Sequence, residues 1–220
     1  MKNQKYLAFL ILIGGKSTRF GSEKAIIQLY GKPLILHQLE ILAEFDEDIY
    51  LVAHSEEQIS IYRKEIEFPK DINFIVDDRE IFEHSNIFKP MLGIYSGLKE
   101  LMKIGFKSVF LLSCDMPLIN PKVINLMISY SKDVECCIPR WNNGFLEPFF
   151  AIYPVKKGFE RAKQILLNQN YGLMNFIDKN WSINYISVEE LIKPLDKNLV
   201  SLININGPID LLKLIELNKN

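Results

Sequence analysis

A glycine-rich segment near the amino terminus carries the residues best suited to bind phosphate groups. Segment 14–24, GGKSTRFGSEK, combines glycines that permit close backbone approach to a ligand with the basic residues Lys16, Arg19 and Lys24. It is not a P-loop, because that pattern needs a glycine where Leu10 stands. The spacing of its glycines also differs from the dinucleotide fingerprint. The segment therefore indicates a polyphosphate-binding loop of another kind.

Carboxylates follow two other apolar runs of the sequence. Asp115 comes directly after such a run, and Pro117 stiffens the chain that follows it. A carboxylate at this point suits Mg²⁺ on a nucleotide, although an aspartate is also common in turns and helix caps. Asp77 and Asp78 follow another run, and either one is a candidate to bind a base or a metal.

Alternating strand and helix patterns indicate how these residues are positioned. Strands are expected at 7–13, 48–53, 73–76, 108–113, 134–138, 148–153 and 181–186, and helices at 33–45, 91–103, 121–131, 158–167 and 208–217. This alternation predicts a Rossmann-like, three-layer α/β/α fold with a mainly parallel sheet. Ligands of such sheets bind beyond the carboxyl ends of the strands, where the glycine-rich loop and the aspartates fall.

Length and composition favour one soluble domain over residues 1–220. The chain is 48% hydrophobic and has a formal net charge of -1, without a block of like charges for nucleic-acid binding. The apolar run at 7–13 is too short for a signal peptide or a membrane span. Three cysteines with irregular spacing predict neither disulfides nor a zinc site. We therefore expect a cytoplasmic protein that binds neither nucleic acid nor membranes.

Five segments in order along the chain carry a resemblance to a known family. They are LIGGKSTRFGSEK at 12–24, KPMLGIYSGL at 89–98, LLSCDMPLI at 111–119, EPFFAIY at 147–153 and NINGPIDL at 204–211. The chain resembles the MobA-like nucleotidyltransferases and, within them, is most similar to the molybdenum cofactor guanylyltransferases. The resemblance implies a fold of the nucleotide-diphospho-sugar transferase type. Its amino-terminal part would bind nucleotide, and residues of about 130–210 the acceptor.

The resemblance also implies a reaction and its partners. GMP would pass from GTP to the terminal phosphate of molybdopterin-bound molybdenum cofactor, with Mg²⁺ present and pyrophosphate released. The further partners that this implies are cofactor-delivery proteins and molybdoenzyme chaperones. Two alternatives stay open: a related cytidylyltransferase or sugar-phosphate nucleotidyltransferase, and a non-catalytic nucleotide-binding adaptor. The doubled glycine argues against the former, and the Arg19, Lys24 and Asp115 set argues against the latter.

Roles for single residues follow from the same resemblance. The β- and γ-phosphates are expected at Gly14, Gly15, Ser17 and Arg19, the α-phosphate at Lys24, and Mg²⁺ at Asp115. The nucleoside is expected against Leu12, Ile13 and Gly14, with His54 and Asp78 near it. Asn204 and Asn206, taken to lie near the end of the last strand, and the polar loop with Arg140, Asn142 and Asn143 are candidates for the acceptor. Ile13 replaces a usual alanine and is expected to add bulk near the base and ribose.

Overall fold

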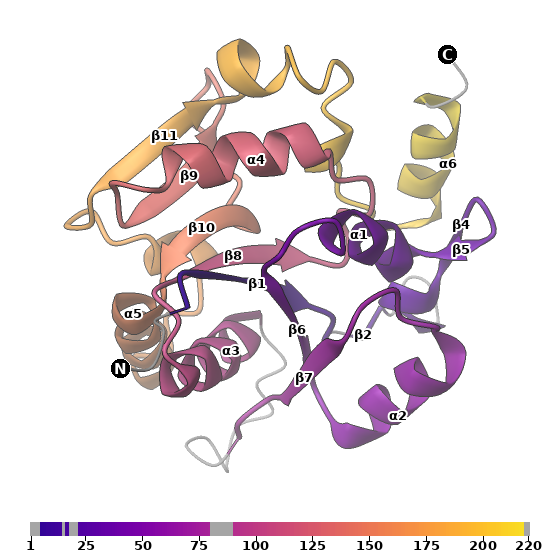
Figure 1. The fold of residues 1–220 in the computed structure, drawn as a ribbon, viewed down its shortest axis with the longest axis horizontal. Helices are drawn as coiled ribbons and strands as arrows, with labels where there is room; N and C mark the ends of the chain where they lie inside the picture. Colours follow the sequence, from indigo (N-terminus) through magenta and orange to yellow (C-terminus); the bar gives the residue numbers. More distant parts are fainter. Residues whose placement is uncertain (1–4, 15, 18–21, 80–89, 218–220) are drawn as a thin grey trace.

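A central β-sheet organises the computed structural model, which describes residues 5–14, 16–17, 22–79 and 90–217. Within these residues seven strands form one sheet in the order β11-β9-β10-β8-β1-β6-β7 (Figure 1). Their bounds are β1 Leu7–Leu12, β6 Asp48–Ala53, β7 Ile72–Val76, β8 Ser108–Ser113, β9 Cys136–Arg140, β10 Phe150–Pro154 and β11 Ile183–Ser187. The predicted apolar runs therefore all form strands of a single sheet.

The strand directions bring the carboxyl ends of most strands to one edge. β1 pairs in parallel with β6 and β8, β6 with β7, and β9 with β11. β10 runs antiparallel to both of its neighbours, β8 and β9. The start of β10 thus meets the ends of the other strands, which confirms the prediction of a mainly parallel sheet. We call this side of the molecule the carboxyl edge.

Helices cover both faces of the sheet because successive side chains of β1 point to opposite sides. Phe9 and Ile11 pack against α1 (Leu34–Leu42), α2 (Glu56–Glu65) and α4 (Pro121–Tyr130). Leu10 and Leu12 pack on the other face, against α3 (Pro90–Ile104) and α5 (Val155–Leu167), which lie side by side in Figure 1. The result is the expected three-layer α/β/α architecture.

Helix α2 was not expected from the sequence, because only Ile59 and Tyr62 of its residues combine large apolar surface with burial. Its boundaries nevertheless have ordinary signals. Ser55 is the N-cap and accepts a hydrogen bond from the Gln58 N–H, while Arg63 and Lys64 occupy the last turn.

Two glycines let α3 lie close to β1. A Cβ atom added to Gly97 would lie 2.5 Å from Leu10 Cδ2, and one added to Gly93 would lie 3.3 Å from Leu12 Cδ2. Real Cβ atoms do not approach carbon at 2.5 Å, so Gly97 is required for the contact. The glycines of the LGIYSGL segment thus serve packing between helix and sheet.

The carboxy-terminal segment differs from the prediction. Asn204 and Asn206 do not follow a strand, because β11 ends at Ser187 and leads into the π-helix η4 (Val188–Ile192) and the 3-10 helix η5 (Val200–Leu202). Residues 203–206 form an irregular segment before α6 (Pro208–Leu217). Ile205 and Leu214 bury this end of the chain against Leu29 and Leu34.

Several small elements lie within the glycine-rich segment and directly after it. β2 (Lys16–Ser17) pairs with β3 (Ser22–Glu23), β4 (Gln28–Leu29) pairs with β5 (Lys32–Pro33), and a 3-10 helix, η1, spans Lys24–Ile26. The three cysteines are free and buried. In the part of the chain that the structure describes, no helix has the length and apolar character needed to cross a bilayer.

Candidate functional site

An ion pair joins the glycine-rich loop to the end of β8. Lys24, the first residue of η1, places its Nζ atom 3.2 Å from Asp115 Oδ2. Both side chains are largely buried, with 17% and 18% of their surface exposed. The other carboxylate oxygen, Asp115 Oδ1, is buried and has no hydrogen-bond partner among the described residues. A positive and a negative group are thus held side by side at the carboxyl edge.

Backbone carbonyl groups of Asp115 and of its neighbours accept hydrogen bonds from two other parts of the chain. The Gln38 side chain, fully buried in α1, donates to the carbonyl oxygens of Ser113 at 2.8 Å and Met116 at 2.6 Å. The N–H of Ile205 donates to the Asp115 carbonyl oxygen at 2.8 Å. Asn204 and Asn206 therefore flank Ile205, which is hydrogen-bonded to the backbone of Asp115. Sequence reasoning did not single out Gln38, whose polar side chain on an apolar helix face was the available signal.

The start of the glycine-rich loop is anchored in the core. Ile13 donates its N–H to Val52 O at 3.0 Å, and its side chain, 1% exposed, packs in the cluster that contains Phe9 and Ile11. The bulk of Ile13 thus enters the core, and its side chain presents almost no exposed surface to a ligand. Leu12 is also buried, whereas Gly14 is exposed.

His54 and Asp77 lie at the ends of neighbouring strands β6 and β7. A Cβ added to Gly14 would lie 3.5 Å from His54 N, so this histidine borders the loop. Its Nδ1 atom is buried without a hydrogen-bond partner in the described part of the chain, unlike that of an ordinary surface histidine. Asp77 donates its N–H to Ala53 O, and burial raises the pKa of its carboxyl to about 6. The adjacent Arg79 opposes that rise.

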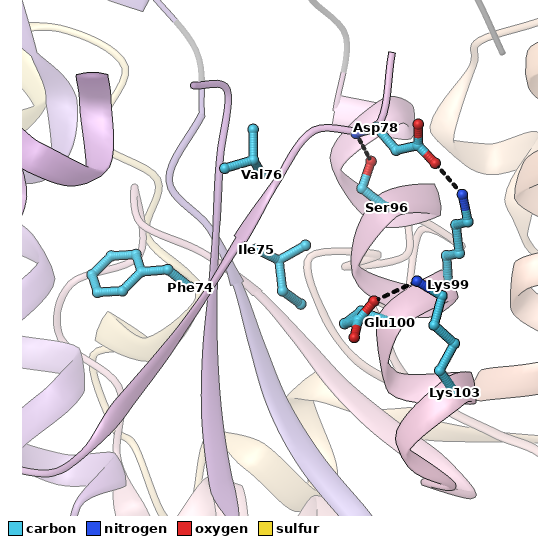
Figure 2. Close-up of a pocket in the computed structure, with 8 residues that line it drawn as sticks. All are labelled: Phe74, Ile75, Val76, Asp78, Ser96, Lys99, Glu100 and Lys103. Carbon is cyan, nitrogen blue, oxygen red and sulfur yellow. Dashed lines mark hydrogen bonds and ion pairs between the residues drawn. The ribbon is translucent and has the colours of Figure 1, made fainter. Parts of the chain in front are cut away.

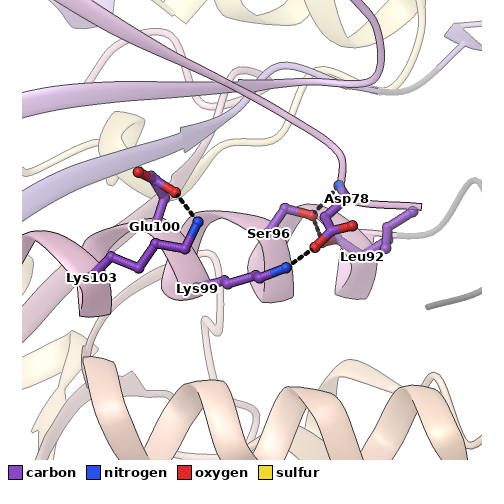
Figure 3. A network of polar contacts seen from close by, with 6 residues as sticks. All are labelled: Asp78, Leu92, Ser96, Lys99, Glu100 and Lys103. Atoms are coloured by element: carbon purple, nitrogen blue, oxygen red, sulfur yellow. Dashed lines mark hydrogen bonds and ion pairs between the residues drawn. The ribbon is translucent and has the colours of Figure 1, made fainter. Parts of the chain in front are cut away.

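Asp78 is directed toward α3 and forms part of a polar network on that helix. Lys99 forms an ion pair with Asp78 Oδ2, and Ser96 Oγ accepts a hydrogen bond from the Asp78 N–H at 2.8 Å (Figure 3). Ser96 Oγ in turn donates to Leu92 O. Sequence analysis did not predict this network, because Asp78 follows β7 whereas its partners lie on α3.

A cavity of about 430 Å³ lies between β7 and α3, beside Asp78 (Figure 2). The Lys103–Glu100 ion pair lies further along the same helix. The cavity is lined by Phe74, Ile75, Val76, Asp78, Ser96, Lys99, Glu100 and Lys103. Of these residues, only Asp78 was expected to bind a ligand.

The polar loop after β9 also reaches the carboxyl edge. The Arg140 guanidinium lies 4.7 Å from the centre of the Tyr185 ring, and the Asn142 N–H donates to the Glu189 carboxylate. Asn143 Oδ1 accepts from the N–H of Phe145 at 3.0 Å, which closes the turn. These contacts fix the loop beside the start of β10, on the same edge as Asp115.

Some expected site residues lie outside the described part of the chain. They are Gly15 and Arg19, and Ser17 is described only through its backbone in β2. Asn206 donates its N–H to Asp210 Oδ2 at 2.9 Å at the start of α6. Among the residues described, no group of three or more His, Cys, Asp or Glu side chains is arranged to hold a metal ion.

The sheet order and the charged carboxyl edge place the molecule among α/β proteins with the nucleotide-diphospho-sugar transferase fold. Molybdopterin-guanine dinucleotide biosynthesis protein A from Archaeoglobus fulgidus superposes with a TM-score of 0.75 over 96% of this chain and 98% of its own, at 24% identity. The 4-diphosphocytidyl-2C-methyl-D-erythritolsynthase of Anaerococcus prevotii gives a TM-score of 0.68 over 98% and 97%, at 13% identity. These similarities show the fold.

Sequence comparison identifies the family. The model of the MobA-like NTP transferase domain matches residues 9–183, so the chain belongs to the MobA-like nucleotidyltransferases. A probable molybdenum cofactor guanylyltransferase from Thermococcus sibiricus is 34% identical over 93% of this chain and 95% of its own. One of the same description from Pyrococcus horikoshii is 32% identical over 82% and 86%. The family predicted from the sequence is thereby confirmed.

Proposed function

We propose that the protein is a GTP:molybdenum cofactor guanylyltransferase. A terminal phosphate oxygen of molybdopterin-bound cofactor attacks the α-phosphorus of GTP in line, the bond to the β-phosphate oxygen breaks, and pyrophosphate leaves. The Lys24–Asp115 pair at the carboxyl edge carries this proposal. Nucleotidyl transfer depends mainly on positioning and on neutralising phosphate charge, and this pair supplies charge at a fixed place. The descriptions of the relatives support the choice of substrates.

The amino-terminal half is assigned to GTP. Lys24 stabilises the charge that develops at the α-phosphate, while the backbone of Gly14 and Gly15 binds the β- and γ-phosphates with Ser17 and Arg19. The core position of Ile13 supports a role for its backbone rather than its side chain beside the nucleoside. His54 is also placed near the nucleoside, because it borders Gly14.

Mg²⁺ is the metal that the Asp115 carboxylate would hold. Mg²⁺ in nucleotide sites is commonly bound by one or two carboxylates together with substrate phosphates and waters, so a larger cluster of protein ligands is not required. The buried Asp115 Oδ1, which has no hydrogen-bond partner among the described residues, fits this use. The bound ion would neutralise phosphate charge.

The second half of this single domain is assigned to the acceptor. The Arg140 loop and the segment with Asn204 and Asn206 both reach the carboxyl edge, the latter through the bond between Ile205 and Asp115. A cationic side chain such as Arg140 suits the acceptor phosphate. We place the reaction in the cytoplasm, with cofactor-delivery proteins and molybdoenzyme chaperones as further partners, and without nucleic acid or membrane.

Base selection is assigned to Asp78. A carboxylate accepts hydrogen bonds from N1–H and the exocyclic amine of guanine, a pair of donors that adenine and cytosine do not present. Lys99 compensates the charge of this carboxylate in the ligand-free protein. Losing the two hydrogen bonds from guanine beside a wrong base would cost about 1 to 3 kcal/mol, which corresponds to roughly tenfold or greater discrimination.

Pyrophosphate release with molybdopterin acceptor and each nucleoside triphosphate tests the proposal. GTP should give the highest rate, and Asp78→Ala should reduce that preference. Thermal shifts provide a second readout, since a ligand at 100 times its dissociation constant adds roughly 2.7 kcal/mol of stability. A preference for CTP would contradict the guanine assignment. A GTP preference that survives in Asp78→Ala would move base recognition to another group, with Asp77→Ala as the next variant.

A further inference from the structure

A buried glutamine in α2 connects the two ends of the glycine-rich loop. The Gln58 side chain is 1% exposed, and its Nε2 atom lies 3.2 Å from the carbonyl oxygen of Ile13, the residue before Gly14. The same atom donates to Oε2 of Glu23, the residue before Lys24. One carboxamide therefore contacts the chain where it enters the loop and where it leaves it.

The other side of the carboxamide is also engaged. Gln58 Oε1 accepts from the His54 N–H at 2.9 Å, at the end of β6. Ser55 and Gln58 have the spacing of a capping box, in which the glutamine reaches back to the N-cap N–H. Here it reaches one residue further, to His54, and so links helix, strand end and loop.

A tyrosine completes this buried polar cluster. Tyr62, one helical turn after Gln58, places its hydroxyl 3.1 Å from Glu23 Oε2 and 3.1 Å from Gln58 Nε2. Burial raises the pKa of Tyr62 well above its ordinary value, so the hydroxyl remains a donor. The Glu23 carboxylate thus has two donors from α2, which offset the cost of its desolvation.

The chemistry of the position favours an amide over the alternatives. The groups around it require two N–H donors, for Ile13 O and Glu23, and one acceptor, for the His54 N–H. A glutamine offers this combination, whereas a glutamate at 58 has no N–H and would face the Glu23 carboxylate. A leucine would fill the space, but Ile13 O, the Glu23 carboxylate and the His54 N–H would each lose one hydrogen-bond partner.

We propose that Gln58 is a positioning residue that holds the glycine-rich loop in its nucleotide-binding geometry, acting through Ile13 on Gly14 and through Glu23 on Lys24. The inference rests on the proposed function. It extends that function by making the loop's geometry depend on α2, an element that does not itself carry a proposed ligand contact. Misplacing Lys24 also disturbs its pairing with Asp115, so binding and turnover both respond.

The test combines single variants of Gln58 with a double variant that exchanges the side chains of Gln58 and Glu23. Gln58→Leu should lower GTP affinity and turnover by on the order of tenfold or more, since small displacements of positioning groups have effects of this size. Gln58→Glu should be at least as damaging because two carboxylates then meet. The double variant Gln58→Glu with Glu23→Gln restores an amide–carboxylate pair and should recover the part of the loss that acts through Glu23, while the contact to Ile13 O stays broken.

Ile59→Ala provides the control for stability. Ile59 is the next residue of α2, is 4% exposed and packs in the core without a polar contact to the loop. The Ile59→Ala variant should have a lower melting temperature, while the GTP affinity and turnover of the folded protein stay unchanged. Hydrogen exchange of the amides in 13–24 should rise in Gln58→Leu and remain at the wild-type rate in Ile59→Ala.

The outcomes separate this inference from the proposed function. Wild-type GTP affinity and turnover in Gln58→Leu would overturn the positioning role, as would a double variant no better than Gln58→Glu. A wild-type protein that binds no nucleoside triphosphate would overturn the proposed function instead. Hydrogen exchange then still tests whether Gln58 holds the loop, because it requires no substrate.

Discussion

Lys24 Nζ and Asp115 Oδ2 lie 3.2 Å apart although 91 positions separate them in the chain. Each residue belongs to a segment that is fixed independently of the other. Lys24 follows Glu23, whose carboxylate is hydrogen-bonded to Gln58 of α2. Asp115 lies between Ser113 and Met116, whose carbonyl oxygens accept hydrogen bonds from Gln38. Neither side chain needs a ligand to keep its place. A nucleotide would thus meet charges that are already positioned, which lowers the cost of ordering them during the reaction.

Asp115→Asn should abolish metal-dependent turnover while the protein remains folded. Charge stabilisation by a metal is worth several kcal/mol, so we expect roughly a hundredfold loss or more in pyrophosphate release. The backbone bond from Ile205 N–H to Asp115 O does not involve the exchanged atoms, and cooperative thermal unfolding should persist. Chelation of Mg²⁺ should bring the wild type down to the level of the variant. Normal Mg²⁺-dependent activity in Asp115→Asn would remove the residue from the mechanism.

Lys24→Ala should lower kcat more than GTP affinity. Charge at the α-phosphate develops mainly in the transition state, so its partner acts on the rate. Steady-state kinetics and a separate GTP titration measure the two effects. Lys157→Ala is the matched control and should leave both kcat and GTP affinity unchanged. Lys157 forms an ion pair with Glu135 at the opposite edge of the sheet. A loss confined to affinity would make Lys24 a ground-state binding residue.

Asp77 should make the protein less stable as the pH rises from about 4 to 6. Its carboxyl pKa is raised by burial from 3.8 to about 6, so the folded protein binds the proton more tightly than the unfolded chain in this interval. Ionising the buried group costs on the order of 3 kcal/mol at neutral pH. Asp77→Asn should therefore raise the melting temperature at pH 7, with the gain vanishing below about pH 4. A variant that is less stable than the wild type at pH 7 would contradict this account.

Gly97→Ala should destabilise the protein by about 1 to 3 kcal/mol, the usual cost of overpacking. The added methyl would lie 2.5 Å from Leu10 Cδ2, so the buried Leu10 side chain, β1 or α3 must shift. Gly93→Ala should be closer to neutral, since its nearest contact is 3.3 Å and alanine favours the helix. Urea unfolding of both variants measures the difference. Equal stability of Gly97→Ala and the wild type would show that this contact relaxes without cost.

The sheet could be predicted because its strands are continuous apolar runs, and runs such as 108–113 match β8 residue for residue. Helix α2 escaped prediction because most of its surface is polar and solvated, and only Ile59 and Tyr62 reveal the buried face. The segment around Asn204 was misplaced relative to the last strand, because the sequence pattern did not reveal that η4 and η5 lie between β11 and this segment.

Candidate site residues could be predicted where they belong to the glycine-rich segment, as Lys24 does, or where they follow a strand. Asp115, His54 and the aspartates after β7 were found in the second way. The Lys24–Asp115 contact, the pairing of Lys99 with Asp78 and the bonds of Gln58 join elements far apart in sequence. Such contacts depend on how helices pack on the sheet, which no short motif encodes.

Strand β10 joins the two halves of the sheet, between β8 and β9. It pairs with β8 from Phe150 opposite Leu112 to Pro154 opposite Ser108, so the same sheet continues from the proposed nucleotide side into the proposed acceptor side. A hinge between the two sides would have to break these pairs. Under the proposed function, both substrates would therefore dock on one continuous sheet, and the geometry of attack would be set by where each one docks rather than by the closing of one lobe onto another.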